Sequence, residues 1–375
     1  MSAAGFRREG IGSHFPLDPG AFIGPPRGEF HWPASHGVGL ETGRAAIGWL
    51  LDALGLGHGD RALLPAYVCD AAVAPFRRRG VAVDFYRVGA TLEPDGDDAG
   101  ARITPATRLL MVVHYFGFPL GREVLSRMPQ NPDVVRLEDW VQSPLSAGAL
   151  APEGFGEYRV IAWHKVVSVP DSGLLIRRPD VSAPPMLPPL SFPRAAFFGR
   201  RLLATSLKAV AVTLFDGAPR GFYRPLFEAA ERAADAGVPG RMSCLSRRIL
   251  ERLPVGAIVM RRRENFLRLA KAVSDLPGVT LLRPDLPAGV CPLGLPVRVR
   301  HRDGVLARLI RARIYAPVHW VLPAEVDRAV FPAEASLSDE EITLPVDQRY
   351  GADEMDFVAR TLGEAVKREG GGGAP

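Results

Sequence analysis

A scarce lysine is the first residue of this sequence that could do covalent chemistry. Only four of the 46 lysines and arginines are lysines, and Lys165 lies between the apolar segment 159–164 and a turn at 169–173. A lysine amine can lose its proton and attack a carbonyl carbon, whereas a guanidinium stays charged. The pattern predicts either an amine presented for reaction or an amine that merely extends from a strand end into water.

An acidic residue at the end of an earlier apolar segment could act together with this amine. Asp139 follows the predicted strand 134–138, at the end where open α/β sheets place ligand-binding groups. It precedes Lys165 by 26 residues (165 − 139), which fits one excursion between neighbouring strands. A carboxylate facing a ring nitrogen keeps a bound pyridine protonated, so the pair indicates pyridoxal-phosphate chemistry. Taken alone, Asp139 could simply cap the segment that follows.

The start of a predicted helix is the third candidate. Apolar residues at helical spacing follow Thr42 and Gly43. The free amides of that helix start would suit a phosphate, and Arg44 could add a charged contact. Because most such starts are plain caps, this one gains weight only in combination with the other two residues.

The segments that must position these residues alternate between strand and helix patterns. Strands are predicted at 61–67, 81–88 and 108–115, with a helix at 70–79. Such alternation predicts a mostly parallel sheet flanked by helices. A proline-rich stretch at 179–193 marks a boundary or an active-site loop, because proline interrupts helices and strand pairing.

The second half of the chain predicts longer helices and a smaller lobe. Helical patterns cover 195–215 and 243–274, short strands 279–282 and 295–299, and a final helix 353–367. These elements suit a compact α/β lobe that follows the sheet.

Chain length allows two or three domains of about 100–200 residues each. We expect an N-terminal arm at 1–39, a large domain at 40–240, a small domain at 241–368 and a flexible tail at 369–375.

Composition argues against several other classes of protein. The net charge is +5, yet the basic residues are scattered and the densest cluster, 261–263, predicts a solvated helix face, so nucleic-acid binding is not expected. Cys69, Cys244 and Cys291 form no disulfide or zinc spacing, which favours a reducing cytoplasm and no metal site. No apolar signal core or membrane-spanning stretch is apparent, so no membrane contact is expected.

Eight short motifs occur in an order that can be compared with known families. They lie at 42–46, 57–65, 113–119, 138–142, 165–173, 241–243, 261–265 and 344–350. In this order the chain resembles the DegT-type nucleotide-sugar aminotransferases, which are fold-type-I pyridoxal-phosphate enzymes, over roughly residues 38 to 365. The resemblance implies an α/β fold with a large, mostly parallel sheet domain flanked by helices and a smaller C-terminal α/β lobe.

The resemblance also implies roles for individual residues. Lys165 would carry pyridoxal 5'-phosphate and move the reacting proton, Asp139 would face the pyridine nitrogen, and Gln142 would approach the ring near its phenolate oxygen. The phosphate would be received at the helix start, by Thr42, Gly43 and Arg44.

Two departures from the family pattern change which side chains would touch the cofactor. Ala162 replaces a phosphate-binding serine, and His164 or Arg44 could take over that contact. Cys69 stands where the family often stacks an aromatic ring, and Tyr67 is the nearby ring that could do so instead.

Three further polar residues have two readings each. His319 falls where the small lobe of the family approaches the substrate, but it could equally be a packed histidine. His114 could lie near the ring or only hydrogen-bond Asp139 or backbone. Arg241 could bind a substrate phosphate or cap a helix.

The implied function is an aminotransferase of polysaccharide or natural-product biosynthesis. The resemblance implies a cytoplasmic homodimer that moves an amino group from an amino acid, with glutamate the expected donor, to a nucleotide-linked keto sugar. Another pyridoxal-phosphate reaction remains open, either dehydration or transamination of a non-sugar ketone. An inactive scaffold paralogue also remains open, because the serine is lost and Pro239 replaces an asparagine that reaches the partner's cofactor.

Overall fold

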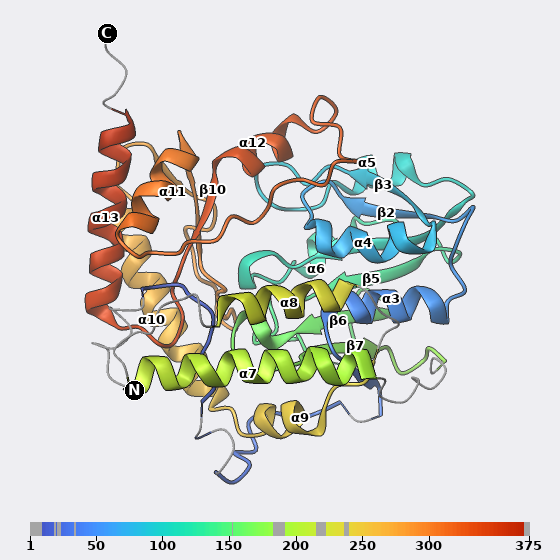
Figure 1. Cartoon of the computed structure of the whole chain (residues 1–375). Coiled ribbons are helices and arrows are strands. Elements are labelled where there is room, and N and C mark those ends of the chain that lie inside the picture. The colour runs from blue at the N-terminus through green and yellow to red at the C-terminus, as the bar shows by residue number, and fades with distance from the viewer. Residues whose placement is uncertain are drawn as a thin grey trace.

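A seven-stranded, mostly parallel sheet forms the larger layer of the molecule (Figure 1). In spatial order its strands are β1 (Gly37–Leu40), β7 (Gly173–Arg177), β6 (Tyr158–Ala162), β5 (Val135–Asp139), β4 (Thr107–Val113), β2 (Arg61–Pro65) and β3 (Ala82–Tyr86). Strands β2 to β6 run parallel, whereas β7 is antiparallel to both of its neighbours. This architecture confirms the predicted fold class.

The computed structural model describes most of the chain. The described residues are 10–18, 20, 24–33, 35–151, 153–182, 192–214, 223–235 and 240–370. Parts of three expectations therefore lie outside them: residues 1–9, 19, 21–23 and 34 of the arm, the tail from 371, and most of the proline-rich stretch. Pro239 also lies outside the described residues.

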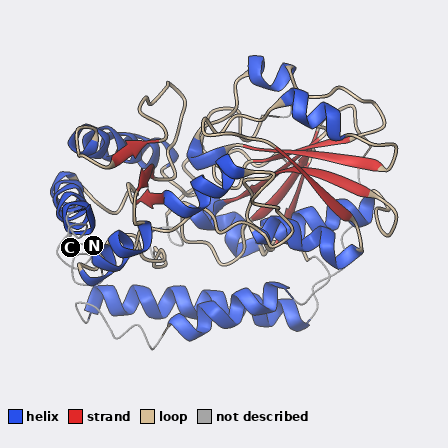
Figure 2. Cartoon of the chain, turned by 90° about the horizontal axis from the view of Figure 1, so that it is seen from above, coloured by secondary structure: helices blue, strands red, loops and turns tan. Residues whose placement is uncertain are grey.

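Apolar strands build the core of the large sheet. Strand β4 is buried at six of its seven positions, as expected when helices cover both faces of a parallel sheet. Figure 2 shows helices on both sides of the fan of strands. They include α3 (Gly43–Ala53) and α4 (Asp70–Arg79), with the shorter α5 (Gly96–Arg102) and α6 (Arg122–Ser126).

A second, three-stranded antiparallel sheet lies beside the first. Its order is β10 (Glu341–Leu344), β9 (Leu295–Val299) and β8 (Val279–Leu281). The helices of this C-terminal lobe are α10 (Val255–Val273), α11 (Arg302–Arg311), α12 (Pro332–Glu340) and α13 (Ala352–Gly370). The predicted domain boundaries stay a prediction, although the two sheets lie on either side of residue 240 in the chain.

Two helices follow the large sheet and precede the small sheet in the chain. Helix α7 (Phe192–Leu214) packs against α8 (Arg224–Asp235), and the pair runs along one side of the molecule (Figure 1). Among the described helices, none is long and apolar enough to cross a bilayer.

One predicted helix is interrupted. The pattern over 243–274 forms two helices, α9 (Cys244–Leu250) and α10, and Pro254 stands at the N-cap of the second. Proline has no amide to donate and clashes with a preceding helical turn, so the continuous helix was a wrong prediction.

The prediction that the arginines at 261–263 face solvent was wrong for the central one, Arg262. Arg262 is 1% exposed and donates from Nη1 to the carbonyl oxygens of Pro292 and Leu293, at 3.0 and 3.1 Å. Its guanidinium therefore ties α10 to the segment before β9 instead of facing water.

Candidate active site

The carboxyl ends of the parallel strands meet at one edge of the large sheet. Strand β5 ends there with Asp139, β6 ends there just before Lys165, and α3 begins there after β1. Side chains alternate between the faces of a strand, so Glu138 and Asp139 point to opposite sides. Asp139 lines a cavity at this edge, while Glu138 bonds to His114 and Arg159 on the other side.

We call this cavity, of about 190 Å³, the small cavity. It brings together eight of the residues predicted from the sequence: Thr42, Gly43, Arg44, Cys69, Asp139, Gln142, His164 and Lys165. Its lining also contains Ser172, Arg201 and Trp320, which the sequence had not singled out. Four predicted residues lie outside this lining: Tyr67, His114, Arg241 and His319.

The amine of Lys165 lies at the cavity without a hydrogen-bond or ion-pair partner among the described residues. Lys165 ends a single 3-10 turn, η2 (Trp163–Lys165), directly after β6. Its Nζ lies 5.7 Å from the centroid of the Trp320 ring, and it makes no hydrogen bond or ion pair with the described residues. Burial raises the pKa of Asp139, and the Val141 amide and the Lys165 charge offset this only in part. The amine and the buried carboxyl are therefore close enough to influence each other.

Gln142 and Asp139 leave polar atoms available to a ligand. Asp139 is 9% exposed and its Oδ1 accepts from the Val141 amide at 2.8 Å. The Oε1 of Gln142 accepts from the Phe116 amide at 2.7 Å, but its buried Nε2 has no partner among the described residues. Such a buried donor costs about 1–3 kcal/mol, so an acceptor atom bound in the cavity would be stabilised there.

The start of α3 forms another part of the cavity wall. Thr42 is the N-cap, and its Oγ1 accepts from the Ala45 amide at 3.0 Å. The other first-turn amides have no intrahelical acceptor, and Gly43 lines the cavity. A Cβ on Gly173 would lie 2.3 Å from the Thr42 carbonyl oxygen, so glycine is required for β7 to approach the helix start this closely.

A neutral histidine lies among cations beside this helix start. The Nδ1 of His164 is 3.0 Å from Ser172 Oγ, which also accepts from the His164 amide at 3.2 Å. Burial lowers the pKa of His164 well below its usual value, and the charges of Arg201, Lys165 and Arg44 lower it further. This end of the cavity is therefore electropositive without the help of the imidazole.

Two aromatic rings, those of Phe197 and Trp320, line the small cavity. Tyr67 is fully buried, its hydroxyl donates to the carbonyl oxygen of His319, and its ring centroid is 5.6 Å from that of Trp320. Cys69 lines the cavity at the N-cap of α4. The structure thus brings Trp320 to the cavity wall and places Tyr67 behind it.

His114 has two protein partners. Its Nδ1 accepts from the Leu120 amide at 2.9 Å, so the proton lies on Nε2, which donates to Glu138 at 2.9 Å. The hydrogen bond from His114 and the charge of Arg159 outweigh burial and lower the pKa of Glu138 to about 2. His114 therefore supports the sheet behind Asp139. Arg241 is exposed, and its backbone bridges to Leu40.

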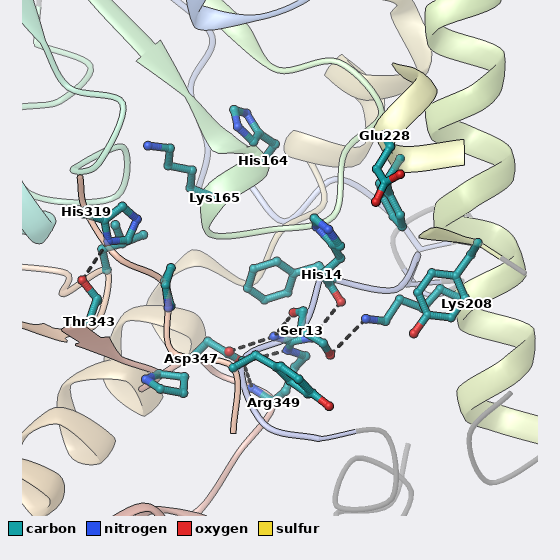
Figure 3. Close-up of a pocket in the computed structure, with 18 of the residues that line it drawn as sticks. Ser13, His14, His164, Lys165, Lys208, Glu228, His319, Thr343, Asp347 and Arg349 are labelled. Carbon is teal, nitrogen blue, oxygen red and sulfur yellow. Dashed lines mark hydrogen bonds and ion pairs between the residues drawn. The ribbon is translucent and has the colours of Figure 1, made fainter. Parts of the chain in front are cut away.

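A second, large cavity of about 780 Å³ opens beyond Lys165 (Figure 3). His164 and Lys165 line both cavities. The large cavity is also lined by the N-terminal segment 12–15, by side chains of α7 and α8, and by the C-terminal lobe. Apart from its histidines, its charged side chains are Lys165, Lys208, Glu228, Arg232, Arg262, Asp347 and Arg349.

His319 belongs to this large cavity. Its Nδ1 lies 2.7 Å from Thr343 Oγ1, and its amide donates to Glu341 at 2.6 Å. Burial, reinforced by the charge of Lys165, lowers the pKa of His319 to about 3, so the ring is neutral near pH 7.

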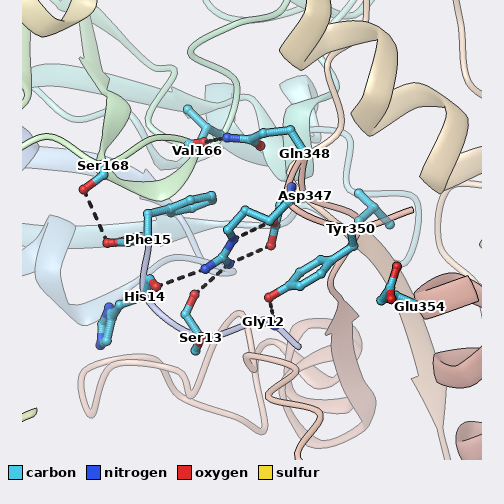
Figure 4. Close-up of polar contacts among 12 residues, drawn as sticks. Gly12, Ser13, His14, Phe15, Val166, Ser168, Asp347, Gln348, Tyr350 and Glu354 are labelled. Carbon is cyan, nitrogen blue, oxygen red and sulfur yellow. Dashed lines mark hydrogen bonds and ion pairs between the residues drawn. The ribbon is translucent and has the colours of Figure 1, made fainter. Parts of the chain in front are cut away.

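The C-terminal lobe also holds the N-terminal segment and the turn that bears the amine (Figure 4). Arg349 pairs with Asp347 and donates to the carbonyl oxygens of Ser13 and His14 at 2.7 and 3.0 Å. The carbonyl oxygen of Val166 accepts from Gln348 Nε2 at 2.8 Å and from an Arg262 Nη2 3.4 Å away. The C-terminal lobe is thereby linked both to the N-terminal segment that lines the large cavity and to the residue that follows Lys165.

The fold and the convergence of Lys165, Asp139 and the α3 start on one cavity define a fold-type-I pyridoxal-phosphate enzyme. The model of the DegT/DnrJ/EryC1/StrS aminotransferase family matches residues 28–147. The match covers about a third of the chain, and it agrees with the resemblance predicted from the sequence.

Relatives and solved structures agree with this assignment. The chain is 25% identical to a dTDP-4-dehydro-2,3,6-trideoxy-D-glucose 4-aminotransferase of Saccharopolyspora spinosa, over 90% of this chain and 92% of that protein. The aminotransferase TlmJ from Streptoalloteichus hindustanus shares the fold with a TM-score of 0.64 at 21% identity, over 90% and 87% of the two chains. Bacillus subtilis NtdA, solved with its cofactor PMP, has a TM-score of 0.63 at 16% identity, over 88% and 73%.

Proposed function

We propose that this enzyme uses pyridoxal phosphate to transfer an amino group from an amino acid, with glutamate as the expected donor, to a nucleotide-linked keto sugar. The observation that carries the proposal is the position of Lys165. Its amine has no hydrogen-bond or ion-pair partner among the described residues and borders both cavities.

The residues of the small cavity fit the cofactor. The unpartnered Nε2 of Gln142 offers a donor for an oxygen on the ring, and the buried carboxyl of Asp139 suits a protonated ring nitrogen. Lys165 would carry the cofactor, and the first turn of α3 would receive its phosphate. When bound, the cofactor supplies a carbonyl carbon for the amino group and a ring that withdraws electrons from it.

The protein side chains would then position the substrates and move the proton. Lys165, once released, can take a proton from the donor's α-carbon and return it on the acceptor side, as its amine is shared by both cavities. Trp320 and the neutral His319 cover the amine from the C-terminal lobe and limit access of water.

The large cavity supports an anionic acceptor. Its volume of about 780 Å³ is in the range of small-molecule sites, and Lys208 and Arg232 line it from α7 and α8. The Saccharopolyspora spinosa relative is named for a dTDP-linked sugar, and we carry that substrate class to this chain as part of the proposal. We also propose a homodimer acting in the cytoplasm, with which the three free thiols are compatible.

The first test is the colour of the purified protein. Added pyridoxal phosphate should give a visible absorbance band that borohydride removes, and Lys165→Ala should abolish the band and lower activity at least about 10²–10⁴-fold. Lys271→Ala, which removes an exposed amine on α10, is the matched control.

Substrate trials then separate the alternatives. Formation of 2-oxoglutarate from glutamate in the presence of a dTDP-linked keto sugar would support the full proposal. Turnover only with non-sugar ketones would replace the sugar assignment, and a protein that stays colourless with excess cofactor would indicate a scaffold.

A further inference from the structure

A buried arginine from α7 reaches the small cavity. Arg201 is 8% exposed and lines this cavity together with Thr42, Gly43 and Arg44. It lies 36 residues beyond Lys165 in the chain (201 − 165). Its helix, α7, follows the last strand of the large sheet and precedes the first strand of the small sheet. The start of α3 and the guanidinium of Arg201 therefore share one cavity.

Arg201 is held in place by neighbouring rings. Its Cζ lies 5.6 Å from the centroid of Phe227 on α8, and Phe227 in turn stacks on His14 at 4.3 Å. Cation–π contacts of this kind orient a guanidinium. The α7–α8 pair thus places an oriented guanidinium at the cavity.

The lining of the small cavity has more cations than carboxyl groups, which favours a bound anion. Its lining contains the cations Arg44, Lys165 and Arg201 and the carboxyl groups of Glu41 and Asp139. Asp139 is assigned to the ring nitrogen, and His164 adds no charge. A phosphate monoester carries about −1.5 to −2 charges near pH 7, which the helix start and the arginines can accommodate.

The usual hydroxyl contact is absent at the strand end. Ala162 is the last residue of β6 and has no polar side chain, and Ser172 Oγ is engaged by the His164 amide and lies 3.0 Å from its ring. A guanidinium can bind two phosphate oxygens at once, which a single hydroxyl cannot.

We propose that Arg201 of α7 binds the cofactor phosphate together with the first turn of α3. The inference rests on the proposed function, because it assumes that the small cavity holds pyridoxal phosphate. It makes the α7–α8 pair part of the cofactor site.

Equilibrium binding to the cofactor-free protein tests this role. Arg201→Ala should weaken binding of pyridoxal phosphate about 10–100-fold and leave binding of pyridoxal, which lacks the phosphate, unchanged. Arg200→Ala removes the same charge from an exposed neighbouring position on α7 and should leave both affinities unchanged. Arg201→Lys should recover part of the loss in affinity, since lysine restores the positive charge but cannot donate two parallel hydrogen bonds as a guanidinium does.

The outcomes separate the possible failures. Equal weakening of pyridoxal phosphate and pyridoxal by Arg201→Ala would overturn the inference, because Arg201 would then shape the cavity instead of holding the phosphate. Equal effects of the Arg200 and Arg201 substitutions would do the same. Thermal melting verifies folding, and Arg201→Gln replaces the alanine variant if that one unfolds. If the unaltered protein binds no pyridoxal phosphate, the proposed function itself fails.

Discussion

The two walls of the small cavity come from different parts of the chain. Asp139, Gln142 and Lys165 lie at or just beyond the ends of adjacent strands β5 and β6, so the sheet alone brings them together. Trp320 and Arg201 come from the C-terminal lobe and from α7, 155 (320 − 165) and 36 residues beyond Lys165. The strand-end wall carries the groups to which we assign the reaction, and the distant wall adds an aromatic ring and a guanidinium to the lining in front of them.

After Lys165, Asp139 is the residue of the strand-end wall whose substitution should lower activity most. Asp139→Asn removes the negative charge without changing size, so a bound ring nitrogen would lose its proton. We expect kcat/KM to fall about 10²–10³-fold, while the absorbance band persists because Lys165 is intact. An activity near that of the unaltered enzyme would show that this carboxyl does not face the ring.

The distant wall should give a smaller effect at Trp320. Trp320→Ala should weaken cofactor binding up to about 10-fold, in line with about 0.5–1.5 kcal/mol for an aromatic contact, and Trp320→Phe should retain most of the affinity. Tyr67→Phe is the companion variant, since it keeps the ring behind Trp320 and removes the hydroxyl bound to His319. A larger loss with Tyr67→Phe than with Trp320→Ala would reverse the order of the two rings.

The smallest effect concerns Glu341, which supports the distant wall through the His319 amide. Burial raises the pKa of Glu341 to about 8, whereas an unfolded glutamate ionises near pH 4.3. Glu341 therefore stays protonated to a higher pH in the folded chain than in the unfolded chain. Its contribution to the free energy of unfolding is complete below about pH 4 and is lost as the pH rises to about 8.

Glu341→Gln isolates that contribution because glutamine is neutral at every pH. Between pH 5 and 8 the melting temperature of the unaltered protein should fall relative to that of the variant by at least about 2–4 °C. Parallel melting curves across this range would mean that Glu341 ionises normally in the folded protein.

Sequence reasoning recovered the strand-end wall because its information is local. An apolar segment followed by a polar residue marks a strand end, and the 26-residue spacing places Asp139 and Lys165 on adjacent strands. The sequence also singled out Asp139 and not Glu138, and in the structure Asp139 is the one that lines the cavity.

The distant wall could not be read in the same way. Trp320 lay beside His319 in a segment already considered, but nothing in the sequence indicated which ring would reach the cavity. Arg201 is one arginine among many in a helical pattern, and Arg262 was misjudged because burial in this lobe depends on which carbonyl groups surround it. These positions depend on packing between segments far apart in the chain.

The two hydrogen bonds accepted by the Val166 carbonyl oxygen bear on whether the large sheet could work as a separate fragment. Gln348 and Arg262 fasten the turn that follows β6 to the C-terminal lobe. A fragment that keeps the large sheet but ends before α10 would retain β6. It would lose the hydrogen bonds from Arg262 and Gln348 that hold the turn with Lys165 in place. We therefore expect the covalent binding of pyridoxal phosphate that we propose for Lys165 to depend on both lobes and not on the large sheet alone.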